Sequence, residues 1–157
     1  MRFLNRRSFV AALGASMAFA AGAAQMRDRS PRILFVCQFG SVKSAIAREL
    51  LRRRAKQAHV GLEVASRGIT PEEHLPALIK DKLLLDHIDP AAEPLRQVRQ
   101  ADLDAADRVI AFDKLPPTLH APKAEDWTDV PSILNDYESA RTELDRQIES
   151  LVRAYQR

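Results

Sequence analysis

The sequence predicts a single α/β domain in three layers, with a four-stranded parallel sheet that carries helices on both faces. Short apolar runs alternate along the chain with longer segments of helical period. The first apolar run shows no polar alternation, which is typical of a parallel strand buried on both faces. A length of 157 residues, with 46% apolar and 29% charged residues, fits one globular domain and excludes a disordered tail or a multidomain protein.

The N-terminal residues are predicted to be an export signal. A basic start precedes an apolar run from Phe9 to Ala24, and small residues near its end have the spacing of a cleavage site. Arg6 and Arg7 are similar to the twin-arginine motif of bacterial signals. An ordinary secretory signal and a retained anchor are the alternatives. The predicted divisions are the signal at residues 1–24, a linker at 25–31 and the domain at 32–157.

The excess of positive charge belongs to this predicted signal. The chain has 24 Lys and Arg against 21 Asp and Glu. Three of the basic residues (Arg2, Arg6 and Arg7) lie in the first 24 residues, which hold no acidic residue, so the remainder has 21 of each sign. Binding to nucleic acid through phosphate contacts is therefore not expected. We expect an encounter with the export machinery and a mature chain that is periplasmic or secreted in a bacterium.

The first half of the domain reads as strand, helix, strand. Ile33–Cys37 is a continuous apolar run and predicts a buried strand. From Lys43 to Gln57, apolar residues recur at helical spacing with arginines assigned to the other side, and Ser41 or Ser44 can cap this helix. Val60–Ala65 alternates and predicts a second strand.

The second half continues the alternation. Apolar residues at helical offsets predict a helix over Leu75–His87, which Asp89-Pro90 ends. Four prolines make Leu115–Ser132 a loop with at most one helical turn. The remaining predicted elements are a short strand at Leu95–Val98, a helical turn at Ala101–Ala106, a strand at Arg108–Phe112 and a long amphipathic helix at Asn135–Arg157.

The only cysteine, Cys37, stands at the end of the first predicted strand, where ligands of parallel sheets bind. It cannot form an intramolecular disulfide, so a thiol in an oxidising compartment points to a function. The backbone amides that follow, the Lys43 cation and the helix start suit a tetrahedral oxyanion, and the same field favours the thiolate. A buried thiol without a function is one alternative. A Walker loop is excluded, because Val42 stands where that motif needs glycine.

The segment Cys37–Ser44 resembles the signature of the low-molecular-weight protein tyrosine phosphatases and the arsenate reductases of the same fold, in which Cys, five residues, a basic residue and Ser open a helix. Ser66–Ile69, Asp102–Asp113 and Trp127–Pro131 resemble later motifs of that family in the same order, so the resemblance covers residues 32–157. It implies hydrolysis of phosphotyrosine, in a phosphorylated protein, or of another small aryl phosphate through a phosphocysteine. It further implies a monomer without metal or organic cofactor.

The resemblance also implies roles for individual residues. Cys37 is the nucleophile, Lys43 binds the phosphoryl oxygens, Ser44 steadies the thiolate and Asp129 protonates the leaving oxygen. Trp127 either walls the pocket or belongs to the core. The substrate-binding residues implied are Gln38, Phe39, Gly40, Ser41, Val42, Ser44 and Trp127.

Three positions depart from the family pattern. Lys43 replaces an arginine, Val130 stands where the acid precedes proline so that Asp129 is one position early, and Gly40 replaces an asparagine. Lysine lacks the rigid fork that grips two oxygens. A weak or inactive phosphate- or arsenate-binding protein is therefore the alternative, with an arsenate-reductase-like protein less favoured because no second cysteine can relay a disulfide. Lys43→Arg together with Val130→Asp is expected to raise activity.

Overall fold

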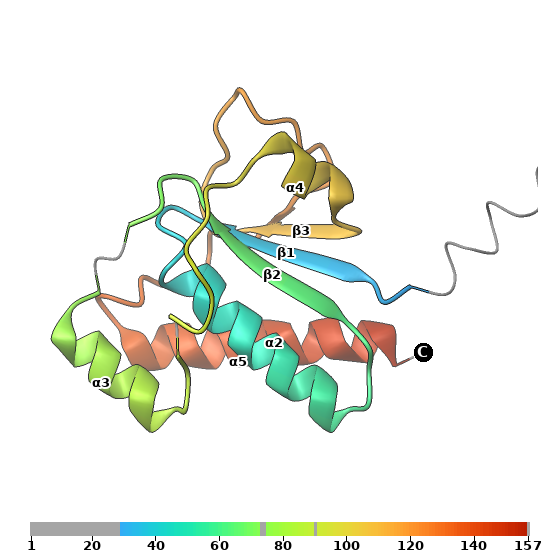
Figure 1. The fold of residues 1–157 in the computed structure, drawn as a ribbon. Coiled ribbons are helices and arrows are strands. Elements are labelled where there is room, and N and C mark those ends of the chain that lie inside the picture. The colour runs from blue at the N-terminus through green and yellow to red at the C-terminus, as the bar shows by residue number, and fades with distance from the viewer. Residues whose placement is uncertain (1–28, 73–74, 90, 157) are drawn as a thin grey trace, which may run out of the picture.

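The computed structural model describes residues 29–72, 75–89 and 91–156 (Figure 1). The predicted export signal at residues 1–24 lies outside these ranges. In chain order the elements are β1 (Arg32–Cys37), α2 (Lys43–Gln57), β2 (Glu63–Gly68), α3 (Ala77–Leu85), α4 (Gln100–Ala105), β3 (Arg108–Ala111), β4 (Glu125–Asp126) and α5 (Tyr137–Tyr155).

The four strands form one sheet in the order β2-β1-β3-β4, and every neighbouring pair is parallel. β1 lies inside the sheet, and all of its residues except Arg32 are buried. This explains its unbroken apolar sequence, because both faces of a parallel sheet are covered. The predicted α/β class with a four-stranded parallel sheet is confirmed.

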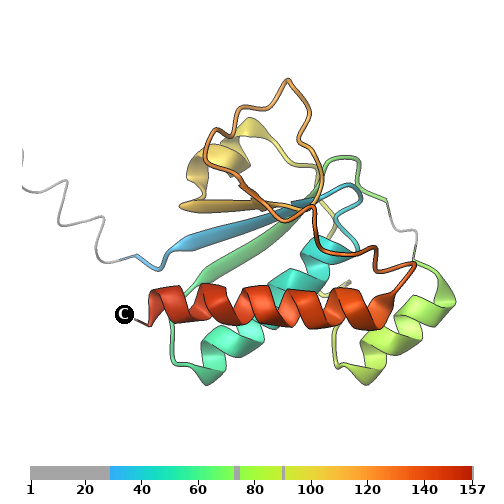
Figure 2. The same cartoon turned by 180° about the vertical axis from the view of Figure 1, so that it is seen from behind.

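Helices cover both faces of the sheet, as Figures 1 and 2 show: α2, α3 and α5 lie on one side, and α4 lies on the other. The larger core fills the first side and joins inward residues of β1, such as Phe35, to α2 and α5. A smaller core on the α4 side contains Leu34, Val36 and Leu103. Alternate residues of β1 therefore point into opposite cores, as the pleat of a strand requires.

Helix α2 has the bounds that the sequence predicts, but the placement of its arginines is partly wrong. Arg48 is 2% exposed and lies on the same buried stripe as Ser44, Leu51 and Ala55. These positions are separated by four, three and four residues and therefore share one helix face. The spacing alone could have identified Arg48 as an inward residue.

Two strand predictions need correction. The fourth strand of the sheet is β4, which lies in the proline-rich segment predicted to be a loop. The predicted strand at Leu95–Val98 is reduced to an isolated parallel bridge between Gly68 and Gln97. β4 was missed because a strand of two residues is too short to show periodicity. The apolar residues at 95 and 98 are too few to predict continuous hydrogen bonding to a neighbouring strand.

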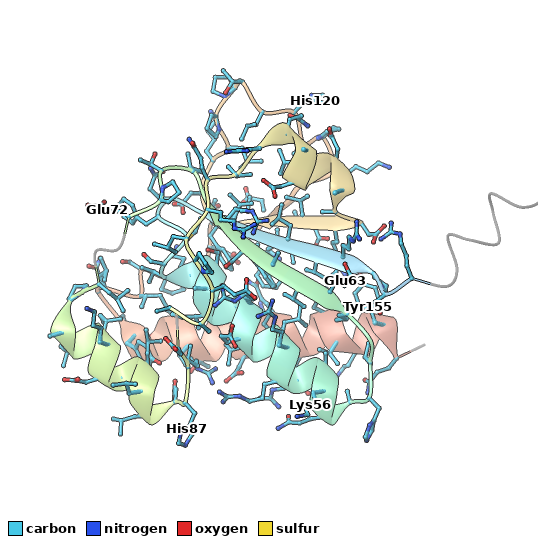
Figure 3. All side chains as sticks on the ribbon, viewed as in Figure 1. Lys56, Glu63, Glu72, His87, His120 and Tyr155 are labelled. Atoms are coloured by element: carbon cyan, nitrogen blue, oxygen red, sulfur yellow. The ribbon has the colours of Figure 1, made fainter. Side chains whose placement is uncertain are left out.

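The carboxyl ends of the three longer strands meet at one edge of the sheet. In register, Cys37 of β1 pairs with Gly68 of β2, and the preceding residue Val36 pairs with Ala111 of β3. Figure 3 shows Glu72 near this edge, with Glu63 far from it. Cys37 therefore enters its loop between two other strand ends. None of the helices in the described ranges is both long and apolar enough for a membrane span.

Candidate functional site

Cys37 places its sulfur among polar groups at the strand-end edge. The side chain is 3% exposed. The Gly40 amide donates to Sγ over 3.2 Å, and the Ser44 hydroxyl lies 3.0 Å from Sγ. Donors that point at a sulfur suit a nucleophile that carries negative charge. The sulfur is therefore built into the loop–helix junction and not merely packed among aliphatic side chains.

The loop carbonyls after Cys37 are turned outward by the segment that continues from β2. Amides of residues 69–72 donate to three consecutive carbonyl oxygens of the loop. In a trans peptide the C=O and the next N–H point in opposite directions, so the amides of Phe39 and Gly40 are turned away from that segment. The three bonds run from Ile69 N to Cys37 O (3.0 Å), from Thr70 N to Gln38 O (2.8 Å) and from Glu72 N to Phe39 O (3.2 Å).

Several amides of the loop have no acceptor within the described ranges: those of Phe39, Ser41, Val42 and Lys43. They stand at the N-terminus of α2, where the helix dipole adds positive potential. The first loop amide differs, because Gln38 N donates to Asp113 Oδ2 over 2.8 Å. The loop thus offers unpaired donors beside a sulfur, which is the arrangement that a tetrahedral oxyanion needs.

Gly40 permits this loop to form because it touches the end of β2. Its φ of 75° lies in the left-handed region that favours glycine. A Cβ on Gly40 would lie 2.8 Å from Gly68 N, and a Cβ on Gly68 would lie 2.7 Å from Phe39 O. Ser66, two residues before Gly68, accepts a hydrogen bond from Arg48 Nη1 at 2.8 Å. The glycine that departs from the family pattern is thus accommodated by a close approach of two backbones.

Ser41 and Ser44 have different environments although both are buried. Ser44 Oγ contacts the Gly40 carbonyl at 3.3 Å as well as the sulfur, so it ties the loop to α2. Ser41 lines a cavity of about 410 Å³ beside α3, and its hydroxyl has no hydrogen-bond partner within the described ranges. Of the two hydroxyls, that of Ser44 is the one that contacts the sulfur.

Lys43 extends toward the late loop, which is formed by residues 127–131 after β4. Its Nζ donates to the Val130 carbonyl oxygen at 2.9 Å, and the side chain is half-buried. The Val130 side chain is 1% exposed and belongs to the larger core. We call the loop between β1 and α2 (residues 38–42) the cradle loop. The structure therefore places the ammonium group of Lys43 where the cradle loop meets the late loop.

The two predicted site residues of the late loop, Asp129 and Trp127, lie in different environments. Asp129 is exposed, and its Oδ1 accepts from Gln147 of α5 at 3.5 Å. Trp127 is buried against Phe35 and Phe112, with ring centroids 5.9 and 5.8 Å away. Of the two interpretations that the sequence left open for Trp127, the structure places the indole in the core.

The carboxylate of Asp126, the last residue of β4, is held in its ionised form. Asp126 Oδ1 accepts from the Thr128 amide at 2.8 Å. Hydrogen bonds from the Thr128 hydroxyl and amide lower the pKa of Asp126 below its ordinary value. The Thr128 hydrogen bonds therefore engage the Asp126 carboxylate within its own turn.

Sequence reasoning missed Asp113, which contacts the loop, and Arg48, which contacts Ser66 at the end of β2. Asp113 follows β3 and accepts the first loop amide; its position one residue beyond the end of an apolar strand was the available signal. Arg48 was assigned to the exposed side. Within the described ranges no group of three or more His, Cys, Asp or Glu side chains could hold a metal ion.

The comparisons with known proteins agree with this geometry. A family model described as low molecular weight phosphotyrosine protein phosphatase matches residues 32–151. No match was found among curated protein sequences.

Solved structures share the fold at low sequence identity. A low molecular weight protein tyrosine phosphatase from T. tengcongensis has a TM-score of 0.63 at 23% identity, covering 80% of this chain and 99% of that one. The YwlE arginine phosphatase from Geobacillus stearothermophilus has 0.62 at 24%, covering 80% and 93%. A thioredoxin-dependent arsenate reductase from Corynebacterium glutamicum has 0.63 at 23%, covering 87% and 67%.

Proposed function

This chain belongs to the low molecular weight phosphotyrosine protein phosphatase family, and we propose that it hydrolyses phosphate monoesters with Cys37 as the nucleophile. The observation that carries the proposal is the sulfur itself. It lies within hydrogen-bond distance of Gly40 N and Ser44 Oγ, beside loop amides that have no acceptor within the described ranges. A nucleophile and a site for its tetrahedral target thus share one loop.

In the first step the Cys37 thiolate attacks phosphorus. The S–P bond forms as the P–O bond to the leaving group breaks, and the leaving oxygen takes up a proton. The amides of Ser41 and Val42 and the N-terminus of α2 stabilise the charge on the equatorial oxygens. In the second step water attacks the phosphocysteine, so that the S–P bond breaks, inorganic phosphate leaves and the thiolate is restored.

Two side chains complete the proposed chemistry. Lys43 follows Val42 at the start of α2, and its Nζ, which donates to the Val130 carbonyl, has further N–H groups for a phosphoryl oxygen. Asp129 is exposed on the same loop and is the proposed proton donor. A missing general acid costs about 10² to 10⁴ in rate. Because Lys43 lacks the rigid fork of an arginine and Asp129 stands one position early, we predict a slow enzyme.

The proposed leaving group is an aromatic alcohol, as in phosphotyrosine. Phe39 supports this choice, because its ring is 36% exposed and belongs to the loop that follows the nucleophile. An exposed ring can contact the face or edge of an aryl group. The arginine phosphatase among the structural neighbours makes phosphoarginine the comparison substrate.

A second candidate is a phosphate- or arsenate-binding protein with little or no turnover. The contact between Lys43 and Val130 favours it, because the same contact directs the cation to a backbone carbonyl of the protein. Arsenate reduction that relays a disulfide within the chain is not supported, since Cys37 is the only cysteine of the sequence. For either candidate we propose a periplasmic or secreted protein, on the basis of the signal-like residues 1–24.

The test compares the full chain with Cys37→Ser on p-nitrophenyl phosphate, phosphotyrosine and phosphoarginine, with inorganic phosphate binding measured in parallel. Turnover by the native chain and none by Cys37→Ser is expected, with phosphotyrosine preferred to phosphoarginine. If neither protein turns over any substrate while both bind phosphate, the binding function replaces the catalytic one. Equal turnover by both proteins would refute Cys37 as the nucleophile.

A further inference from the structure

Arg48 carries a full positive charge inside the domain. Its side chain is 2% exposed, and it is the largest of the fully buried side chains. Nε donates to Glu49 Oε1 at 2.7 Å, and Nη1 donates to Ser66 Oγ at 2.8 Å. Glu93 Oε2 lies 3.6 Å from Nη1. Arg48 thus joins α2 to the end of β2 and to the segment before β3.

The contact with Ser66 leads to the nucleophile through the backbone. Two residues after Ser66, Gly68 lies against Gly40 so closely that neither position has room for a Cβ. Gly40 donates its amide to the sulfur of Cys37. A shift of the end of β2 therefore changes the position of the donor that faces the nucleophile.

Helix α2 provides a second connection between Arg48 and the nucleophile, through Ser44. Ser44 lies one turn before Arg48 on the same buried stripe of α2. Its hydroxyl contacts Cys37 Sγ at 3.0 Å and the Arg67 carbonyl at 3.5 Å. Ser44 and Arg48 therefore fix two points of the wall that β2 forms around the loop.

Burial of this guanidinium lowers the stability of the fold through desolvation. Removing a charge from water costs several kcal/mol even after relaxation, and an apolar residue of similar size is often as stabilising as a buried ion pair. In addition, Nη2 of Arg48 has no hydrogen-bond partner within the described ranges. Desolvation thus offsets the contribution of Arg48 to folding stability. It does not weaken the contact with Ser66, through which Arg48 holds the end of β2 in position.

We propose that Arg48 is a positioning residue of the active site, which acts through Ser66 and the Gly68–Gly40 contact to hold the loop amides on the nucleophile and on the bound phosphoryl group. The proposal rests on the proposed function and names a residue outside the signature segment. It predicts a loss in kcat more than in KM, because misalignment weakens transition-state contacts more than substrate binding.

The test uses Arg48→Met, Arg48→Lys and Ser66→Ala in the full chain. Arg52→Met is the matched control: Arg52 lies one turn further along α2 and contacts Glu49 and Glu93 as well, but it reaches the Val64 carbonyl and not Ser66. Methionine keeps much of the volume of the arginine stem, and both glutamates have access to water once Arg48 is removed.

We expect Arg48→Met to lower kcat by about ten- to a hundredfold, the scale of a small misplacement of reacting groups, with little change in KM. Arg48→Lys should recover most of this loss, since an ammonium group can still donate to Ser66. Arg48→Met with Ser66→Ala should be no slower than Arg48→Met alone, because both changes break one link. Arg52→Met should keep the native kcat.

A second measurement keeps the proposal separate from turnover. Orthovanadate, whose five-coordinate adducts resemble the transition state of phosphoryl transfer, should slow alkylation of Cys37 by iodoacetamide in the native chain and in Arg52→Met, but much less in Arg48→Met and Ser66→Ala. This readout works even if the native chain proves inactive, in which case only the proposed function fails. Native kcat and native vanadate protection in folded Arg48→Met or Ser66→Ala would overturn the role of Arg48.

Discussion

Replacement of Gly40 by alanine tests the contact that shapes the cradle. Gly40 has a φ of 75°, and a Cβ there would lie 2.8 Å from Gly68 N and 3.0 Å from Gly68 Cα. Both atoms belong to backbone whose amide donates to the Arg96 carbonyl at 3.0 Å. Neither atom can move aside as the end of a flexible side chain can.

The expected cost follows from three effects. The left-handed conformation costs an alanine about 1–2 kcal/mol, and forcing an extra methyl group into a packed region costs about 1–3 kcal/mol. The restricted unfolded chain returns about 0.4–1 kcal/mol. Gly40→Ala should therefore lower the free energy of unfolding by about 1–5 kcal/mol, a large share of the ~5–15 kcal/mol of a typical domain.

The assay is urea unfolding of Gly40→Ala beside Gly61→Ala. Gly61 is the matched control, because its Cβ would meet only the Ser30 hydroxyl at 3.3 Å, and its φ lies outside the left-handed region. Gly61→Ala should change the free energy of unfolding by less than ~1 kcal/mol. Vanadate protection of Cys37 should fall in Gly40→Ala alone. Equal stability of the two variants, with vanadate protection intact in both, would refute the Gly40–Gly68 contact.

Three further predictions concern the late loop and the edge of the sheet. Val130→Asp should destabilise the fold by about 3 kcal/mol or more in urea unfolding and should not raise kcat, because a carboxylate would replace a core side chain. A gain in kcat at native stability would instead support the expectation from the sequence that an acid at position 130 raises activity. Lys43→Met should lower the free energy of unfolding by about 1–2 kcal/mol through loss of its hydrogen bond to Val130, and an unchanged value would show that this contact contributes nothing in solution. Hydrogen bonds from the Arg32 amide and the Arg29 side chain lower the pKa of Asp107 below its ordinary value of 3.8. The stabilising effect of Asp107 is therefore complete above pH 3.8 and is lost as the pH falls through the lowered pKa. Acid unfolding of Asp107→Asn should lack this component, and identical acid unfolding of the native chain and the variant would contradict the prediction.

The sequence was most informative where a periodic pattern coincided with burial. The bounds of α2 were predicted because its apolar stripe and the polar segments on either side are unambiguous. β1 was predicted because a short unbroken apolar run before a loop is typical of a strand covered on both faces. The same two elements position Cys37, which explains why the nucleophile loop could be located before the structure was known.

The remaining details depend on tertiary contacts that leave no local pattern. β4 has two residues and exists only because β3 pairs with it. Trp127 is equally compatible with a pocket wall and a core until Phe35 and Phe112 are placed around it. The direction of Lys43 depends on the Val130 carbonyl, which is 87 residues away in the sequence.

The covalent intermediate is the most direct test of the central claim. The full chain is mixed with p-nitrophenyl phosphate, quenched within the first turnovers and digested, and the peptide that contains Cys37 is weighed by mass spectrometry. The account predicts one added phosphoryl group on Cys37 and none in Cys37→Ser. Release of p-nitrophenol by the native chain with Cys37 unmodified at every quench time would contradict it.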